Sequence, residues 1–144
     1  IVHQTKEDNI SALQNFYLSN NLENNIFSYD RNLSTIMMQS DLCITRAGAS
    51  SLAELSVLSI PFIAVPLPSA RDDHQSANAN FYKDKDCCWI LEQSVFEEKI
   101  EEFLENILKD KRDYLKKKES LKKLNYDNSW INVNQKILIN INEN

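Results

Sequence analysis

The chain has 144 residues, 42% of them hydrophobic and 26% charged, which is enough for one globular core and too few for two comfortable ones. Its formal net charge of −5 argues against a general nucleic-acid-binding protein, because no overall positive field would attract phosphate backbones. The apolar runs are much shorter than the roughly 20 residues of a membrane-spanning helix. We therefore expect one domain, no nucleic-acid partner and no segment that crosses a bilayer.

Cysteine usage and the first residues bear on the compartment and on the start of the chain. Cys43, Cys87 and Cys88 show neither metal-ligand spacing nor the pattern of a disulfide framework, which predicts a reducing cytoplasm and no metal. The opening Ile-Val-His-Gln-Thr lacks the charged and apolar regions of a signal peptide. It reads as the end of a buried strand, so we expect a fragment whose upstream part is missing.

Strand-like and helix-like segments alternate from the start of the sequence. In the first part, we expect strands at Ile1–Gln4 and Ile26–Tyr29 and helices at Asp8–Leu18 and Asn32–Gln39. In the second part, we expect strands at Asp41–Thr45, Phe62–Val65 and Cys88–Leu91 and helices at Ser50–Leu58, Asp73–Lys83 and from Ser94 to about Leu108. A capping box of Ser94 and Glu97 is expected to begin the last helix. Its predicted buried face consists of Ile100, Phe103, Leu104, Ile107 and Leu108.

Strands separated by helices of this length predict parallel pairing through right-handed crossovers. The expected fold is therefore α/β, a Rossmann-like parallel sheet with flanking helices. Ligands bind such sheets at the carboxyl ends of the strands. The loops Arg46–Ser51 and Pro66–Gln75 both follow a strand and precede a helix, so we expect them on the same rim.

The first rim loop contains Gly48, the single glycine of the sequence. Ala49, Ser50 and Ser51 then open a helix whose first backbone N–H groups lack intrahelical partners and can bind phosphate. Glycine here is explained by a positive φ or by a ligand that approaches the main chain. An ordinary helix-capping turn is the alternative. Glu54, about one turn into the helix, is a surface carboxylate or, combined with this turn, a ribose ligand.

The second rim loop is fixed by prolines and leads into a helix with polar residues in its first turns. Asp72 or Asp73 can cap this helix. His74 and Gln75 follow, where their side chains can hydrogen-bond the hydroxyls of a sugar. A structural histidine is the alternative, but the cluster with Asn78 favours contact with a ligand.

Beyond Leu108 the sequence becomes basic and then apolar. The basic residues are Lys109, Lys111, Arg112, Lys116, Lys117, Lys118, Lys122 and Lys123. We favour a solvated helix face, with attraction to anionic lipid headgroups as the alternative. The last segment, from Trp130 to about Ile141, carries enough apolar surface to require a partner.

Three segments together resemble one known family. They are Ser40–Leu55 (Ser-Asp-Leu-Cys-Ile-Thr-Arg-Ala-Gly-Ala-Ser-Ser-Leu-Ala-Glu-Leu), Ile60–Pro68 and Asp72–Ala79, and the opening Val2–Thr5 matches too. They closely resemble the MurG family, the UDP-N-acetylglucosamine–N-acetylmuramyl-(pentapeptide) pyrophosphoryl-undecaprenol N-acetylglucosaminyltransferases of bacterial peptidoglycan synthesis. The resemblance implies the C-terminal half of a two-domain GT-B glycosyltransferase. Residues 1–126 would then form a UDP-sugar donor-binding domain, incomplete at its N-terminus, and 127–144 a C-terminal helix that packs on the missing acceptor domain.

The resemblance also implies roles for individual residues. The helix-start groups of Ala49, Ser50 and Ser51 would hold the donor diphosphate, and Glu54 would bind the ribose. The side chains that would contact N-acetylglucosamine are those of His74 and Gln75. The remaining donor-binding positions are Tyr29 and Asp30 in the uracil-binding loop, Arg46 as support of the phosphate turn, Gly48 for close approach, and Leu52 and Ala53 in the helix start. The catalytic base would belong to the missing domain.

The implied reaction is an inverting transfer of N-acetylglucosamine from UDP-N-acetylglucosamine to lipid I, giving lipid II. It would take place peripherally on the cytoplasmic face of the bacterial inner membrane, without cofactor or metal. An anionic membrane surface stays open as a further partner. Two other classes stay open. One is another UDP-sugar enzyme of the same architecture, such as a glycolipid glycosyltransferase or a UDP-sugar hydrolase. The other is a donor-binding subunit that needs a partner chain.

Overall fold

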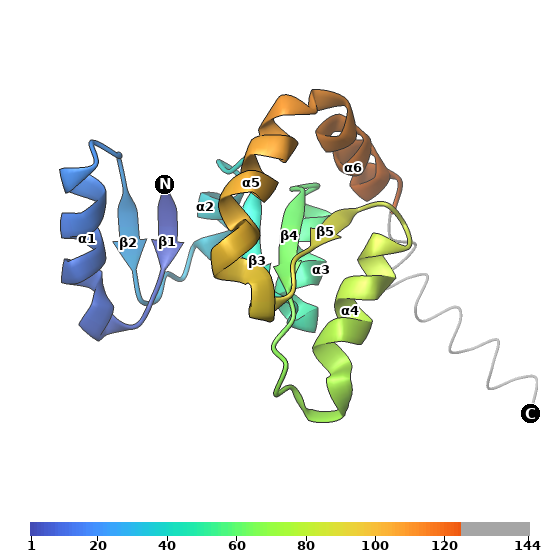
Figure 1. Cartoon of the computed structure of the whole chain (residues 1–144), viewed down its shortest axis with the longest axis horizontal. Coiled ribbons are helices and arrows are strands. Elements are labelled where there is room, and N and C mark those ends of the chain that lie inside the picture. Colours follow the sequence, from blue (N-terminus) through green and yellow to red (C-terminus); the bar gives the residue numbers. More distant parts are fainter. Residues whose placement is uncertain (125–144) are drawn as a thin grey trace, which may run out of the picture. The chain divides into compact units, whose positions relative to one another are not determined.

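The computed structural model describes residues 1–124. The helix expected at 127–144 lies outside the described residues, and the domain boundary at 126 stays a prediction. The chain divides into two compact units, Ile1–Gln39 and Ser40–Asn144, each with its own small parallel sheet (Figure 1). No helix within residues 1–124 is long and apolar enough to span a membrane.

The first unit is a strand-helix-strand arrangement followed by a short helix. Its elements are β1 (Val2–Gln4), a 3-10 turn (Glu7–Asn9), α1 (Ile10–Ser19), β2 (Asn25–Phe27) and α2 (Leu33–Met37). β1 and β2 pair in parallel, with His3 opposite Ile26. The ring of His3 approaches α1, where its Nδ1 lies 2.9 Å from the hydroxyl of Tyr17. The predicted alternation of strands and helices is therefore confirmed in this unit.

The second unit continues the alternation and ends in two consecutive helices. Its elements are β3 (Cys43–Arg46), α3 (Ala49–Val57), β4 (Phe62–Val65), a 3-10 turn (Arg71–Asp73), α4 (His74–Lys83), β5 (Cys88–Ile90), a 3-10 turn (Gln93–Val95), α5 (Phe96–Lys109) and α6 (Lys111–Lys123). The three strands are parallel in the order β3-β4-β5, with Ile63 opposite both Ile44 and Trp89. The predicted parallel α/β sheet is confirmed.

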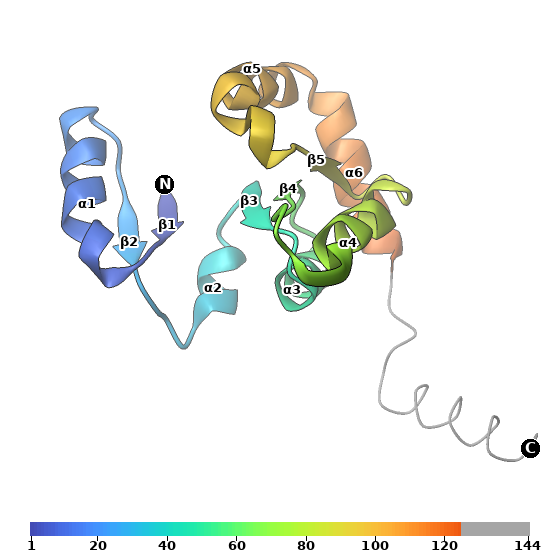
Figure 2. The same ribbon diagram turned by 60° about the horizontal axis from the view of Figure 1, so that its bottom comes forward.

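Helices cover both faces of this sheet. Figure 2 shows α5 on one face and α3 and α4 on the other. Because both faces are covered, all four residues of the central strand β4 are buried. Ile63 and Val65 pack with Leu91 and Ile107 beneath α5. On the opposite face, the ring of Phe62 meets Tyr82 of α4 edge-on at 5.5 Å.

Two expectations about α5 are wrong. Ser94 lies inside a 3-10 turn, and the residue before α5 is Val95, which makes no side-chain capping hydrogen bond. The extra turn therefore replaces the predicted capping box. Leu108 is 71% exposed, whereas the preceding Ile107 is 6% exposed. Since successive helical residues are rotated by about 100°, Leu108 falls beyond the edge of the buried stripe.

The basic helix α6 is solvated on one side and anchored on the other. Lys111, Arg112 and Lys122 are exposed, which agrees with the predicted solvated face. Lys117 is only 6% exposed and faces the sheet. Its buried position contradicts a purely solvated basic stretch.

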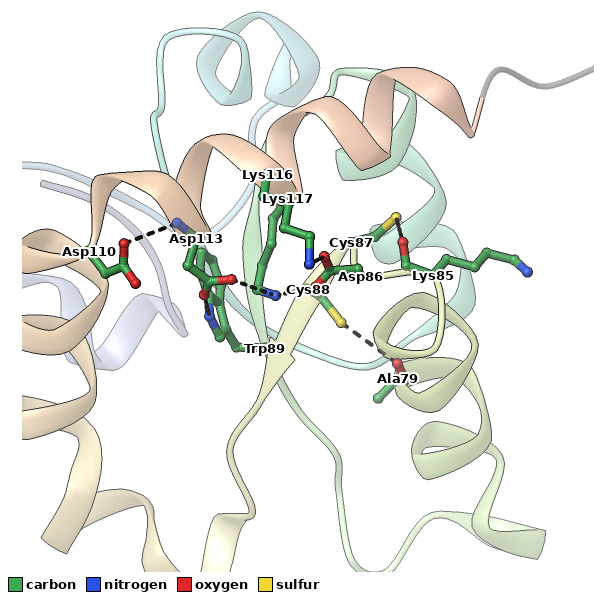
Figure 3. A network of polar contacts seen from close by, with 10 residues as sticks. All are labelled: Ala79, Lys85, Asp86, Cys87, Cys88, Trp89, Asp110, Asp113, Lys116 and Lys117. Atoms are coloured by element: carbon green, nitrogen blue, oxygen red, sulfur yellow. Dashed lines mark hydrogen bonds and ion pairs between the residues drawn. The ribbon is translucent and has the colours of Figure 1, made fainter.

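A network of polar contacts holds Lys117 against β5 (Figure 3). The Lys117 Nζ lies 2.9 Å from Asp86 Oδ1 and 3.5 Å from Asp113 Oδ1, and 5.0 Å from the centre of the Trp89 ring. The Trp89 indole N–H donates to Asp113 Oδ2 at 2.8 Å. Lys116 completes the network through Asp86 Oδ2 at 2.7 Å. Hydrogen bonds from Lys116 and Lys117 lower the pKa of Asp86 below its usual value.

Among residues 1–124, left-handed backbone occurs at five residues, none of them glycine: Asn21, Ser59, Asp72, Asp73 and Asp86. Ser59 follows the end of α3 with φ 56°. The N–H of Ser59 donates to the carbonyl of Ser56, and that of Ile60 donates to Leu55, both at 3.0 Å. This pair of bonds is a Schellman motif, in which glycine is the usual residue.

The three cysteines all belong to the second unit. Cys87 and Cys88 are buried and Cys43 is half-buried. Burial raises the pKa of Cys43 and Cys87 to about 11 and that of Cys88 to about 12. These thiols are protonated at neutral pH, so they are poor nucleophiles.

Candidate functional site

The turn between β3 and α3 is extended rather than left-handed. Gly48, which immediately precedes α3, has φ −70° and ψ 136°. A positive φ therefore does not explain the glycine at this position. A Cβ added to Gly48 would meet only Ser51 Oγ, at 4.0 Å, so the protein leaves the space beside this glycine open. The geometry leaves two explanations for glycine at this position, close approach of a ligand and an ordinary helix-capping turn, because glycine is itself favoured directly before a helix.

The start of α3 presents backbone donors without a capping side chain. The first intrahelical bond runs from the N–H of Leu52 to the carbonyl of Gly48, at 3.0 Å. The N–H groups of Ala49, Ser50 and Ser51 precede this bond, and no side chain caps the helix. These groups carry the partial positive charge of the helix N-terminus. The arrangement is suited to an anion such as a phosphate.

One face of α3 is buried in the core and the opposite face is exposed. Leu52 is completely buried, so its side chain anchors the helix and only its backbone lies near the helix start. Ala53 is half-buried. Ser50 and Glu54 are exposed and stand four residues apart, which places them as neighbours on one helix face. A carboxylate therefore lies on the same exposed face as the hydroxyl of the helix start.

The start of α4 offers one acceptor and one donor. His74 Nδ1 lies 2.6 Å from the carbonyl oxygen of Arg71. Because a carbonyl only accepts, this nitrogen carries the proton, and Nε2 of the neutral ring is an acceptor. Gln75 Oε1 accepts from the N–H of Leu67 at 3.0 Å, which leaves its Nε2 as a donor. Together these atoms can bind sugar hydroxyls.

The aspartates before α4 do not act as predicted. Asp72 and Asp73 both have left-handed backbone, with φ 54° and 52°. Neither side chain caps the N–H groups of α4, so that prediction is wrong. Asp73 instead accepts a hydrogen bond from the hydroxyl of Ser76 at 2.6 Å. Asp and Asn tolerate this backbone region better than other side chains, which explains their use here.

Arg46 joins three segments at the rim. Its Nη1 donates to Gln93 Oε1 at 2.6 Å and approaches the carbonyl oxygen of Val65 at 3.4 Å. It thus connects the end of β3 with the end of β4 and with the turn before α5. The role of Arg46 as support of the phosphate turn stays a prediction, because these two bonds go to β4 and to the turn before α5. Gln93 was missed at the level of sequence, because a lone glutamine in a loop belongs to no pattern.

The predicted uracil-binding residues lie in the first unit. Tyr29 is 74% exposed. Asp30 Oδ1 accepts from the backbone N–H of Asn32 at 2.6 Å, so its side chain supports a local turn. Their participation in a site with residues of the second unit stays a prediction.

Two of the surface pockets formed by the described residues lie in the second unit. The smaller, of about 350 Å³, adjoins the start of α3 and is lined by Ala49, Ala77, Asn78, Phe81 and Tyr82. The larger, of about 580 Å³, is lined by Asn106, Lys109, Asp110, Lys111 and Arg112. The larger pocket lies at the α5–α6 junction and contains none of the predicted site residues. Within residues 1–124, no cluster of three or more His, Cys, Asp or Glu side chains is arranged to hold a metal ion.

The amino-acid sequence of this α/β chain matches a model of a known protein family. A model of the glycosyltransferase family 28 C-terminal domain matches residues 1–129, and the chain belongs to this family.

The chain is also similar to individual members of this family. The UDP-N-acetylglucosamine–N-acetylmuramyl-(pentapeptide) pyrophosphoryl-undecaprenol N-acetylglucosamine transferase of Pelagibacter ubique (strain HTCC1062) is 42% identical over 145 residues, which cover 100% of this chain and 41% of that protein. A protein of the same name from Sulfurovum sp. (strain NBC37-1) is 40% identical over 93 residues, covering 65% of this chain and 28% of that protein. The crystal structure of Acinetobacter baumannii MurG matches with a TM-score of 0.70 and 29% identity, covering 84% of this chain and 35% of that one.

These likenesses confirm the predicted resemblance and the predicted fold. The matched region is only part of the relatives, because the chain spans about two fifths of the length of the Pelagibacter protein.

Proposed function

We propose that this chain is the donor-binding half of an enzyme that transfers N-acetylglucosamine from UDP-N-acetylglucosamine to lipid I, with inversion, to give lipid II. The observation that carries the proposal is the uncapped start of α3 beside the open space at Gly48. A diphosphate placed there would meet backbone donors and no obstructing side chain. The names of the relatives supply the donor and acceptor classes.

The second unit would act mainly on the leaving group. As the bond to the sugar breaks, negative charge grows on the UDP diphosphate. The N–H groups of Ala49 to Ser51 and the hydroxyls of Ser50 and Ser51 would stabilise that charge, and Arg46 would support the turn. This stabilisation needs no metal in principle. A base that accepts the proton of the acceptor hydroxyl would come from the acceptor domain.

Other contacts would orient the donor. Glu54 would accept hydrogen bonds from the ribose hydroxyls, and backbone groups at Tyr29 and Asp30 would meet the uracil. The acceptor nitrogen of His74 and the donor nitrogen of Gln75 would bind hydroxyls of the N-acetylglucosamine. A sugar with the wrong hydroxyl geometry would leave one of these groups without a partner.

The lipid-linked acceptor would place the reaction on the cytoplasmic face of the inner membrane, with the enzyme bound peripherally. The exposed lysines and arginine of α6 are a candidate contact with anionic headgroups. Binding to vesicles that contain an anionic lipid should then weaken when salt is added. Equal retention by neutral and anionic vesicles would contradict this contact.

Calorimetric titration of the full chain with UDP-N-acetylglucosamine, UDP-glucose, UDP and ADP tests the donor site. We expect a preference for uridine ligands and a further preference for the N-acetyl sugar. Glu54→Ala should weaken all uridine ligands about tenfold, the effect of one hydrogen bond to a charged group. Glu98→Ala, at an exposed position of α5, makes the same chemical change and should have no effect.

The outcomes separate the proposal from its alternatives. Equal affinity for the two UDP-sugars would favour another UDP-sugar enzyme of this architecture. Binding that requires a separate acceptor chain would favour a donor-binding subunit. A folded chain that binds ADP more tightly than UDP would contradict the proposed donor site. An unchanged affinity of Glu54→Ala for the uridine ligands would contradict the proposed role of Glu54.

A further inference from the structure

Asn78 makes a contact that the sequence did not suggest. It lies in the second turn of α4, and its Nδ2 donates to the carbonyl oxygen of Ala47 at 3.0 Å. The two residues are 31 positions apart in the sequence. Ala47 is completely buried and immediately precedes Gly48. The side chain therefore ties α4 to the turn that begins α3.

The orientation of the amide follows from the chemistry of its partner. A carbonyl oxygen can only accept, so the NH₂ group of Asn78 must face Ala47. One N–H of this amide is thereby used within the protein. The expected contact of Asn78 with a ligand, beside His74 and Gln75, stays a prediction, because the bond to Ala47 does not use the amide oxygen and Asn78 also lines the pocket beside the start of α3.

The bond acts on the peptide unit between Ala47 and Gly48. A peptide unit is planar and trans, so its carbonyl and its N–H point in opposite directions. Holding the Ala47 carbonyl therefore also fixes the direction of the Gly48 N–H. Gly48 itself is free to rotate around φ and ψ more than any other residue type, which makes an external restraint useful here.

We propose that Asn78 is a positioning residue for the donor diphosphate. By holding the Ala47–Gly48 peptide plane, it directs the Gly48 N–H, immediately before α3, toward the phosphates. This inference rests on the proposed function of the same site. Since Gln75 of the same helix holds the N–H of Leu67, α4 fixes both rim loops and thus the distance between the phosphate and sugar contacts.

The test compares a ligand that has phosphates with one that has none. Asn78→Ala removes the amide, and Asn80→Ala makes the same change at an exposed position of the same helix. Affinities of the full chain for UDP and for uridine are measured by NMR titration, with thermal unfolding as a check on folding. We expect Asn78→Ala to weaken UDP three- to tenfold, about the effect of one hydrogen bond, and to change uridine less than twofold. Asn80→Ala should change neither.

Each other outcome has a definite meaning. Unchanged UDP affinity in Asn78→Ala would overturn the inference and leave the proposed function intact. Equal losses for UDP and uridine would also overturn it, because they would show a general structural role. If the unaltered chain binds neither UDP nor UDP-N-acetylglucosamine, the proposed function fails and the inference fails with it. Should Asn78→Ala not fold, Asn78→Leu with Asn80→Leu as its control nearly keeps the side-chain size and removes the donor without adding a charge, and the same UDP and uridine comparison decides.

Discussion

The two units share a strand-helix-strand plan but differ greatly in how well they bury it. In the first unit, Ile26 is the single hydrophobic residue that counts as buried, and Val2, Phe16 and Leu18 are about half exposed or more. All other buried hydrophobic residues among 1–124 belong to the second unit. A parallel sheet normally needs cover on both faces, and only the second unit has it. The same local pattern therefore buries very different amounts of apolar surface in the two units, and we expect the first unit to be the less stable of the two.

The largest expected effect comes from the core of the second unit. Leu52→Ala should lower the free energy of unfolding by about 2–5 kcal/mol, because it leaves a cavity under α3. Ile26→Ala in the first unit should cost clearly less, since that strand has little around it to lose. Chemical unfolding followed by circular dichroism measures both. Val57→Ala, at a residue 67% exposed on α3, is the control with almost no effect. An equal cost for Ile26 and Leu52 would remove the contrast between the units.

The next effect concerns the network in Figure 3. Asp86→Asn keeps the shape and tolerates the left-handed backbone, but it removes the charge that faces Lys116 and Lys117. We expect a loss of about 1–3 kcal/mol near neutral pH, since the buried Lys117 keeps only Asp113 as a charged partner. Asp84→Asn, at an exposed position, is the matched control.

The same network gives the stability a defined pH dependence. The folded-state pKa of Asp86 is lowered, so its contribution is fully present above the unfolded value near 3.8 and is lost as the pH falls through the folded value. The difference between the Asp86→Asn variant and the unaltered chain should therefore shrink in acid. Urea unfolding at a series of pH values measures it, and a difference that stays constant in acid would argue against the ion pairs.

A smaller effect, of opposite sign, is expected where α3 ends. Ser59→Gly should stabilise the second unit by about 0.5–1 kcal/mol, because glycine occupies a left-handed position without steric cost. Ser59→Ala retains that cost and serves as the control. Thermal unfolding of the two variants compares them directly. A lower melting temperature for Ser59→Gly would show that the serine side chain has a role of its own.

The smallest effect on stability is expected at the candidate site. Gly48→Ala is compatible with φ −70° and meets open space, so two small effects of opposite sign should nearly cancel. Alanine reduces the freedom of the unfolded chain but is a poorer residue than glycine before a helix. Unfolding should change by less than about 0.5 kcal/mol. UDP affinity, measured by calorimetry, should nevertheless fall because the added methyl occupies the open space. Unchanged UDP binding would contradict close approach at Gly48.

Periodicity predicted the alternation of strands and helices well, and Phe62–Val65 was predicted with its observed bounds. The alternation of apolar and polar residues with turn residues between them determines such a fold locally. The predicted start of α5 was wrong because the same local sequence is compatible with two structures. Ser94 and Glu97 match a capping box, but the chain makes a 3-10 turn there instead.

Long-range contacts could not be predicted from the sequence. The positions of Ala49 to Ser51 at a helix start followed from the motif. The bonds from Arg46 to Gln93 and from Asn78 to Ala47 depend on how separate loops meet in space. The sequence also could not predict that Lys117 is buried within a basic run, because its partner Asp86 lies 31 residues away.

The buried thiols of Cys87 and Cys88 can report how often the second unit opens. All three sulfur atoms lie in the second unit, and their raised pKa values keep the reactive thiolate scarce while they are shielded. An alkylating reagent such as iodoacetamide should therefore modify Cys87 and Cys88 only when the second unit opens. Mass spectrometry of the intact chain would then time these openings, and it would not respond to any motion confined to residues 1–39.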